Sequence, residues 1–352
     1  MKFLLVILIS LQFGLQAQTT ISRADYKLLQ QKEDSLKTLS EKIIQGINAQ
    51  DRFNADSLFT RIFVRALSIK NSIQFPFDSL YAISKIDAPD SSFRVYTWQM
   101  IINENIIRQH GAIQMKTKDG SLKLFPLIDK SDITENMADT IADNFGWIGA
   151  VYYKIVQTKY QGKDYYTLLG YDENNIRSNK KIIEILHFED GKPVFGSRQF
   201  SVQAGFGYNN KMARFIMEYK KQASPRLTFD EDLNMIIFEH LISESSQPNK
   251  KWTLIGDGDY EGFKWTDGRW VYVNKVFNQV TPLGGEPVPM PLRDASGNID
   301  PLKLKENDPG QPAATPVKKA AAPAAKKTAA KKAAAKKTAA KKTAAKKAAP
   351  KK

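Results

Sequence analysis

The stretch FRVYTWQMII, residues 93–102, marks the point where the chain changes from helical to strand-like sequence. β-Branched and aromatic side chains dominate this stretch, which is typical of a β-strand. Two similar stretches follow, IRQHGAIQMKT at 107–117 and SLKLFPLI at 121–128, and the KDG between them, at 118–120, is a hairpin-turn signal. Residues 93–128 therefore predict a run of antiparallel strands.

The same succession of short strands and turns continues to about residue 280. Links such as FEDGKP and TDGRW are too short for a parallel crossover, which needs a dozen residues or more. We therefore expect a large antiparallel meander over 91–280, in the form of a sheet, a sandwich or a barrel. One helix is expected to interrupt it near 131–145, with Ser131 or Asp132 at its N-cap and Glu135 placed for a capping box.

Residues 18–90 form a predicted helical region ahead of the strands. Two apolar stripes recur at three- and four-residue steps, and FDSLYAISKI at 77–86 predicts a short third helix. The stripes consist of Leu29, Leu36, Leu39, Ile43 and Ile47, and of Leu58, Phe59, Ile62, Phe63, Ala66 and Leu67. Core packing explains both stripes, and an oligomer formed through the helices is the alternative. The predicted fold class is α+β.

The first 17 residues predict an export signal. Lys2 supplies the positive start, an apolar run follows, and Ala17 is a small residue before a cut that gives a mature chain from Gln18. The alternative is a buried N-terminal element. The chain has no cysteine, which excludes disulfides and thiolate metal sites. Both features point to the periplasm or cell surface of a Gram-negative bacterium.

The positive charge of the chain is concentrated at its C-terminal end. The formal net charge is +15, and seven Lys-Lys pairs from residue 318 onward carry 14 of these charges. Residues 281–316 are rich in proline and glycine and predict an extended or disordered linker. Residues 317–352 contain little besides lysine and alanine, and because like charges repel, this tail is expected to be disordered in free solution.

Such a tail predicts binding to anionic polymers through counterion release, without reading of bases. After export the partners would be lipopolysaccharide, extracellular DNA or RNA. The alternatives are a solubilising extension without a partner and, if 1–17 is not a signal, a cytoplasmic non-specific DNA-binding protein. The candidate binding residues are Lys326, Lys327, Lys331, Lys332, Lys336, Lys337, Lys341, Lys342, Lys346, Lys347, Lys351 and Lys352.

The sequence DGDYEG at 257–262 contains a candidate calcium loop. Asp257, Asp259 and Glu261 alternate and a glycine follows, as in the first half of an EF-hand loop. Gly268 stands where the bidentate glutamate of such a loop belongs, so a hairpin turn with solvated acids is the alternative. No other cofactor is expected.

Aromatic residues are dense near the end of the predicted strands. Tryptophan and tyrosine on neighbouring strands predict a platform for a sugar ring or a peptide, and cross-strand packing within a sheet is the alternative. The candidate platform residues are Trp252, Trp265, Trp270 and Tyr272.

Catalytic motifs are scarce. His110, His187 and His240 are not spaced as metal ligands, and neither a GxSxG nor a GxxxxGK[ST] motif occurs. Acids on strands and turns leave open a hydrolase that uses a carboxylate pair. These acids are Glu184, Glu189, Asp190, Glu218, Glu239 and Asp257. We expect a non-enzymatic binding or structural protein of the envelope, with a periplasmic carboxylate-dependent hydrolase as the alternative.

Several aromatic motifs carry a resemblance to a known group of proteins. LNMIIFEHL at 233–241, WIGAVYYKI at 147–155 and YYTLLGYDENN at 165–175 resemble exported Bacteroidetes proteins of uncharacterised function, over about 75–280. The resemblance implies an envelope location and a β-rich body, and brings no activity with it. The tail resembles, in composition, the Lys/Ala/Pro tails of linker histones and bacterial histone-like proteins.

Overall fold

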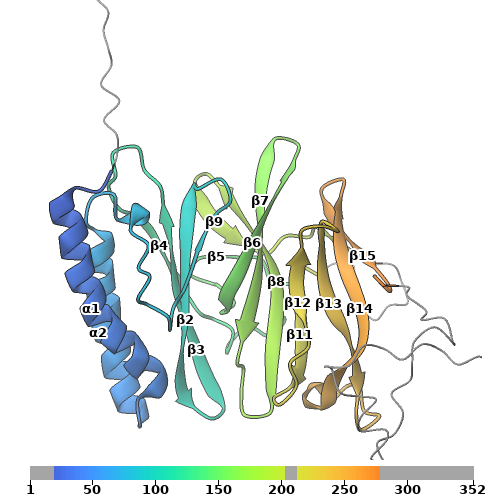
Figure 1. Cartoon of the computed structure of the whole chain (residues 1–352). Helices are drawn as coiled ribbons and strands as arrows, with labels where there is room; N and C mark the ends of the chain where they lie inside the picture. The colour runs from blue at the N-terminus through green and yellow to red at the C-terminus, as the bar shows by residue number, and fades with distance from the viewer. Residues whose placement is uncertain (1–19, 203–211, 278–352) are drawn as a thin grey trace, which may run out of the picture. The chain divides into compact units, whose positions relative to one another are not determined.

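A computed structural model describes residues 20–202 and 212–277 (Figure 1). The predicted signal at 1–17, the linker at 281–316 and the basic tail at 317–352 lie outside the described residues. The helices are α1 (Arg23–Gln45), α2 (Ala49–Leu67) and the short 3-10 turns η1 (Ser72–Gln74) and η2 (Lys251–Thr253). Within the described ranges, no helix combines enough length with enough apolar residues to cross a membrane.

Within the residues that the structure describes, fifteen strands form three sheets. The first sheet has the order β1-β2-β3-β4, the second β5-β9-β8-β7-β6 with β11 also paired to β8, and the third β10-β15-β14-β13-β12. The strands are β1 (Ser84–Asp87), β2 (Phe93–Asn103), β3 (Ile106–Met115), β4 (Lys123–Ile128), β5 (Ala142–Asp143), β6 (Val151–Tyr160), β7 (Lys163–Asp172), β8 (Ser178–Glu189), β9 (Lys192–Phe195), β10 (Phe200–Ser201), β11 (Arg214–Lys220), β12 (Leu227–Asp230), β13 (Met235–Ser243), β14 (Leu254–Thr266) and β15 (Arg269–Val273).

Neighbouring strands are joined mainly as hairpins. Among the described strands, β10 pairs with β15 in parallel and the other named pairs are antiparallel. Strand β8 is the most connected, because β7 pairs with one of its edges while β11 and β9 follow each other along the other edge. The prediction of N-terminal helices followed by an antiparallel β-rich body is confirmed.

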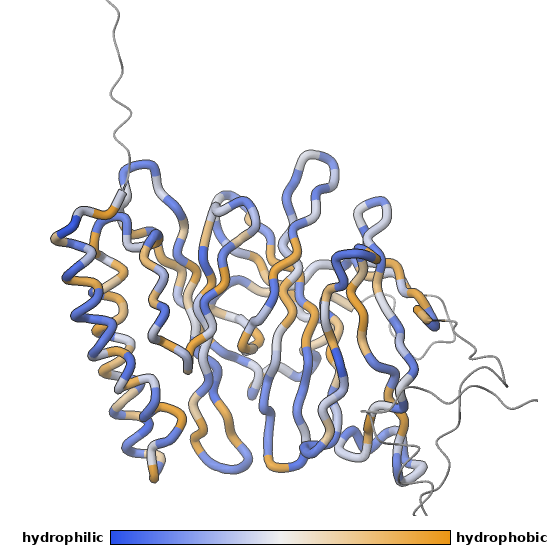
Figure 2. Tube along the Cα trace, viewed as in Figure 1, coloured by the Kyte–Doolittle hydropathy of each residue, from blue (hydrophilic) through white to orange (hydrophobic). Residues whose placement is uncertain are grey.

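The two helices cover one face of the first sheet. Ser22 and Asn48 cap them by accepting backbone N–H groups of their first turns. Their apolar stripes pack on alternate residues of β2, Tyr96 and Trp98 among them. Figure 2 shows the apolar residues of the helices gathered on the side that faces the strands. Core packing accounts for much of both stripes, although Ile47 is almost fully exposed.

The second sheet lies between the other two. Ile182 of β8 packs toward the first sheet together with Phe93 and Val95 of β2. Its neighbour Ile183 points the opposite way and packs with Phe263 of the third sheet. Because successive side chains of a strand alternate between faces, a strand covered on both sides carries an uninterrupted apolar run. The body is therefore a stack of three sheets with one outer helical layer.

The predicted third helix at 77–86 is wrong. The chain there forms turns and then strand β1. Phe77 has a positive φ of 53°, which an α-helix cannot accommodate. Its ring is buried among aromatic residues in the core between the two helices and the first sheet. Burial of Phe77 therefore outweighs the local helical pattern of this segment.

The predicted inserted helix near 131–145 is also wrong. Residues 131–147 form turns and the two-residue strand β5. The guanidinium of Arg214, which lies on β11, donates to the carbonyls of Met137 and Thr140. Asp143 accepts the backbone N–H groups of the two residues that follow Asn144. These contacts give the backbone hydrogen-bond partners that differ from those of a helix.

Candidate ligand pocket

A pocket of about 500 Å³ opens beside β8, at the point where the chain passes from β11 to β12. Its volume lies in the usual range for small-molecule sites. The residues that line it come from β6, β7, β8, β11, the following turn and β12, and we call this set the tyrosine pocket. They are Tyr153, Tyr171, Asn179, Lys181, Tyr219, Ala223, Ser224 and Leu227.

Strand register brings the polar residues of the tyrosine pocket onto one face. Tyr171 of β7 lies directly opposite Lys181 of β8, and Tyr219 of β11 lies directly opposite Asn179 of β8. Side chains at i and i+2 of a strand share a face, so Asn179 and Lys181 point the same way. This is the face of the second sheet that packs toward the third sheet.

Tyr153 reaches the pocket because β6 is irregular at this residue. Tyr152 pairs with Gly170 and Lys154 with Leu169, which leaves Tyr153 as an extra residue in the ladder. The Tyr153 hydroxyl donates to the carbonyl oxygen of Leu227 at 3.0 Å. This contact ties the edge of the second sheet to the first residue of β12.

The three phenols of the pocket are held in the neutral form. Burial raises the pKa of Tyr153 and of Tyr171 well above the usual value, with smaller contributions from Tyr219 to Tyr153 and from Glu173 to Tyr171. Burial also raises the pKa of Tyr219, to about 12. At neutral pH each phenol therefore keeps its proton and can donate as well as accept a hydrogen bond.

Lys181 supplies the positive charge of the pocket. Burial lowers the pKa of its ammonium group, and the Glu239 carboxylate nearby acts in the opposite direction. Glu239 itself accepts a hydrogen bond from the backbone N–H of Arg226 at 3.1 Å. Among the described residues Lys181 forms no ion pair, so its charge is open to a ligand.

Asn179 presents an unpaired acceptor. Its side-chain Nδ2 donates to the carbonyl oxygen of Lys221 at 3.1 Å, which fixes the orientation of the amide. Its Oδ1 is buried and has no hydrogen-bond partner within 20–202 and 212–277. An unsatisfied buried carbonyl costs roughly 1–3 kcal/mol. The geometry thus places an acceptor without a donor on the wall of a pocket.

The residues of the predicted calcium loop all line one pocket of about 320 Å³, together with His240. They lie on the extended strand β14, where Asp257 and Asp259 are exposed and Glu261 is buried. Asp257 forms a 2.8 Å contact with His240 Nδ1, and Glu261 accepts a hydrogen bond from Tyr272. No cluster of three metal-ligating side chains occurs in the part of the chain that the structure describes. An extended strand replaces the turn that a calcium loop needs.

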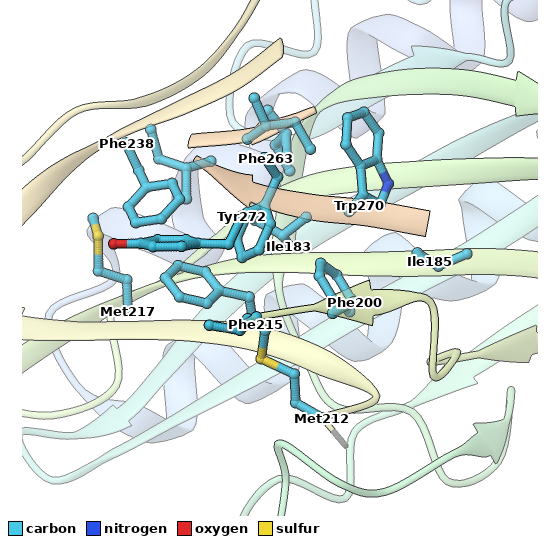
Figure 3. Close-up of a cluster of buried hydrophobic side chains, with 14 of the residues drawn as sticks. Ile183, Ile185, Phe200, Met212, Phe215, Met217, Phe238, Phe263, Trp270 and Tyr272 are labelled. Carbon is cyan, nitrogen blue, oxygen red and sulfur yellow. The ribbon is translucent and has the colours of Figure 1, made fainter. Parts of the chain in front are cut away.

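The predicted aromatic platform is likewise not assembled. Trp270 and Tyr272 are buried in the core between the second and third sheets (Figure 3), so neither offers an exposed face. Trp265 packs on the edge of Trp270, while Trp252 lies apart on η2 beneath the Arg177 guanidinium. Cross-strand and core packing, the alternative raised above, accounts for Trp270 and Tyr272.

The carboxylates considered for catalysis are scattered. Glu184 is fully buried in an ion pair with Arg214 and accepts a hydrogen bond from Tyr152. Glu189 is on the surface beside His187, and Glu218 accepts a hydrogen bond from Ser178. These acids line none of the tyrosine pocket.

No family model, curated protein or solved structure matches this chain. The sequence did not indicate Tyr153, Tyr171, Asn179, Lys181 or Tyr219 as site residues, because their common face depends on strand register. The one local signal for them was the density of tyrosine in GAVYYKI and KDYYTLLGYD.

Proposed function

We propose that this chain is an exported, non-enzymatic binding protein whose folded body takes a small polar ligand in the tyrosine pocket. One observation carries the proposal. Tyr171, Tyr219, Lys181 and Asn179 line one pocket. The two hydroxyls, the ammonium and the Asn179 Oδ1 have no hydrogen-bond or ion-pair partners among the described residues. Unpaired polar groups of this kind favour a ligand or ordered water as their partner.

The phenols of the pocket favour binding over acid–base catalysis. The pocket lining contains three phenols, a lysine, an asparagine and a serine, and among these eight described residues there is no carboxylate or imidazole. General acid–base catalysis at neutral pH needs a group that exchanges its proton near pH 7. The phenols keep their protons far above that pH, as their raised pKa values indicate.

The basic tail supplies the second part of the proposal. Its paired lysines would hold the exported protein to lipopolysaccharide, extracellular DNA or RNA by counterion release. The support is the sequence itself, because the lysines lie outside the described residues. In this arrangement the tail keeps the protein at the anionic polymer, and the folded body binds the small ligand. Mass spectrometry of the protein from the envelope fraction tests export, and the expected mature N-terminus is Gln18.

A thermal-shift screen tests the pocket. The full chain and its Lys181→Met/Asn179→Leu double variant are heated with a set of small polar metabolites. A ligand that binds only the native state raises the Tm in proportion to its saturation. We expect at least one compound to raise the Tm of the wild-type chain and not that of the variant. A set in which every compound acts equally on both proteins would contradict the proposal.

A further inference from the structure

We infer that the tyrosine pocket takes a small hydroxylated carboxylate, the chemistry of a sugar acid, and this inference rests on the ligand-binding function proposed above. It follows from what each unpaired group requires. A ligand that complements the pocket has a negative charge at one point, a hydrogen-bond donor at a second and an apolar ring face between them.

The anion is required by Lys181. Its ammonium is the single cationic group among the described residues that line the pocket, and it forms no ion pair among them. Tyr171 stands directly opposite it across the β7–β8 pair, where side chains lie close enough to act on one group. An ammonium and a protonated phenol together donate to a carboxylate, and such charge-assisted bonds are the stronger kind.

The donor is required by Asn179. Because its Nδ2 is engaged by the Lys221 carbonyl, Oδ1 is the atom that remains for a ligand, and this atom accepts only. A carboxylate without hydroxyls, such as acetate, offers only acceptors and would leave it unpaired. A ligand hydroxyl pairs with it. The hydroxyl of Tyr219 lies opposite Asn179 and can pair with the same part of the ligand.

A positively charged donor fits the pocket less well than a hydroxyl. An amino acid carries an ammonium group, and no aspartate or glutamate is present among the lining residues to balance it. Lys181 would repel it. Glu239, whose charge acts on Lys181, already accepts a hydrogen bond from the backbone N–H of Arg226. Charge complementarity therefore selects an acid with hydroxyls over an amino acid.

The apolar parts of the wall suit a sugar ring. The phenol rings and the side chains of Ala223 and Leu227 provide flat and small apolar surfaces beside the polar groups. The C–H face of a sugar packs on such surfaces while its hydroxyls reach the polar rim. The volume of about 500 Å³ leaves room for a single ring.

Isothermal titration of the full chain tests the inference with four probes: D-glucuronate, D-glucose, inorganic phosphate and L-alanine. We expect D-glucuronate to bind about tenfold tighter than D-glucose, which shares its hydroxyls but lacks the carboxylate. We also expect it to bind tighter than phosphate, which lacks the sugar ring and its several hydroxyls, and than alanine, which carries an ammonium.

Two variants separate the roles of the residues. Lys181→Met should leave the affinity for D-glucose unchanged, because only the charge is lost. It should lower the affinity for D-glucuronate until it equals the affinity for D-glucose. Asn179→Leu should weaken both sugars. Lys192→Met, at the exposed first residue of β9, is the matched control and should change neither.

Each outcome has a definite meaning. Equal affinity for D-glucuronate and D-glucose, or tighter binding of phosphate or alanine, overturns the sugar-acid inference and leaves the ligand-binding function standing. Binding of none of the four probes also overturns the inference. The ligand-binding function itself falls only if the wider metabolite screen is negative as well.

Discussion

Arg214 and Glu184 face each other across the β8–β11 pair as a fully buried ion pair. Arg214 Nη2 lies 2.5 Å from Glu184 Oε1, and both side chains have an exposed fraction of 0%. Glu184 also accepts a 2.5 Å hydrogen bond from Tyr152, whose hydroxyl accepts one from the Trp147 indole. The network ties the 131–147 segment to the middle sheet.

Removing one partner of this ion pair should lower the stability of the fold. Arg214→Met leaves Glu184 as an uncompensated buried charge, so we expect the free energy of unfolding to fall by about 3–5 kcal/mol. Urea denaturation measures it. In the Arg214→Met/Glu184→Met double variant the loss should be smaller than in the single variant, because no charge is left buried. A double variant that is less stable than Arg214→Met would contradict this account.

The unpaired acceptor of Asn179 predicts an unusual response to substitution. Asn179→Leu removes an unsatisfied buried carbonyl, a gain of roughly 1–3 kcal/mol, and loses the bond to the Lys221 carbonyl, a loss of about 1 kcal/mol. We expect the free energy of unfolding of the ligand-free protein to stay level or rise by up to about 2 kcal/mol. A clear loss in urea denaturation would mean that ordered water already satisfies the carbonyl.

His187 predicts a loss of stability in mild acid. Burial lowers the pKa of its imidazole below the usual 6.5, while the hydrogen bond with Glu189 acts in the opposite direction and Lys163 reinforces the burial effect. As pH falls below 6.5 the unfolded chain therefore takes up a proton before the folded chain does. The His187 contribution to stability is present above pH 6.5 and is lost as pH falls toward the folded pKa.

The substitution His187→Phe isolates this contribution. The phenylalanine ring keeps the contact with Tyr165 and removes the titrating group. Between about pH 7 and pH 5 the free energy of unfolding should fall more for the wild-type chain than for the variant. Urea denaturation at several pH values measures the free energy of unfolding of both proteins. If it falls equally with pH for both, His187 is not responsible for the loss of stability in acid.

The tail should act independently of the folded body. Truncation after residue 316 removes the seven Lys-Lys pairs. We expect it to abolish salt-sensitive binding to duplex DNA and lipopolysaccharide and to leave the Tm unchanged. For the full chain the logarithm of the DNA affinity should fall with the logarithm of salt by about 0.9 for each phosphate neutralised. Fluorescence anisotropy at several salt concentrations measures the slope.

A length-matched control separates charge from chain length. A full-length variant with glutamine at the paired lysines should behave as the truncated protein does. Undiminished DNA and lipopolysaccharide binding by the truncated protein would place the binding surface on the body instead.

Local sequence patterns predicted the secondary structure correctly where residues close together in the chain determine it. The stripe from Leu29 to Ile43 predicted a helix, and the β-branched and aromatic run at 93–102 predicted a strand. The same kind of reasoning failed at 131–145. There a capping-box pattern was outweighed by Arg214, which binds the Thr140 carbonyl from 74 residues away. Distant partners of this kind leave no trace in a local pattern.

The aromatic residues show the same limit. Trp270 and Tyr171 both lie on strands rich in aromatic side chains, yet one is packed in the core and the other lines a pocket. A strand assigns its side chains to two faces by alternation, but the sequence does not say which face meets another sheet. The sequence by itself determined the two N-terminal helices, the antiparallel strands and the location of the positive charge, because these depend on periodicity and composition. Only the tertiary structure decided the stacking of the sheets and the residues of the pocket, because both depend on register between distant strands.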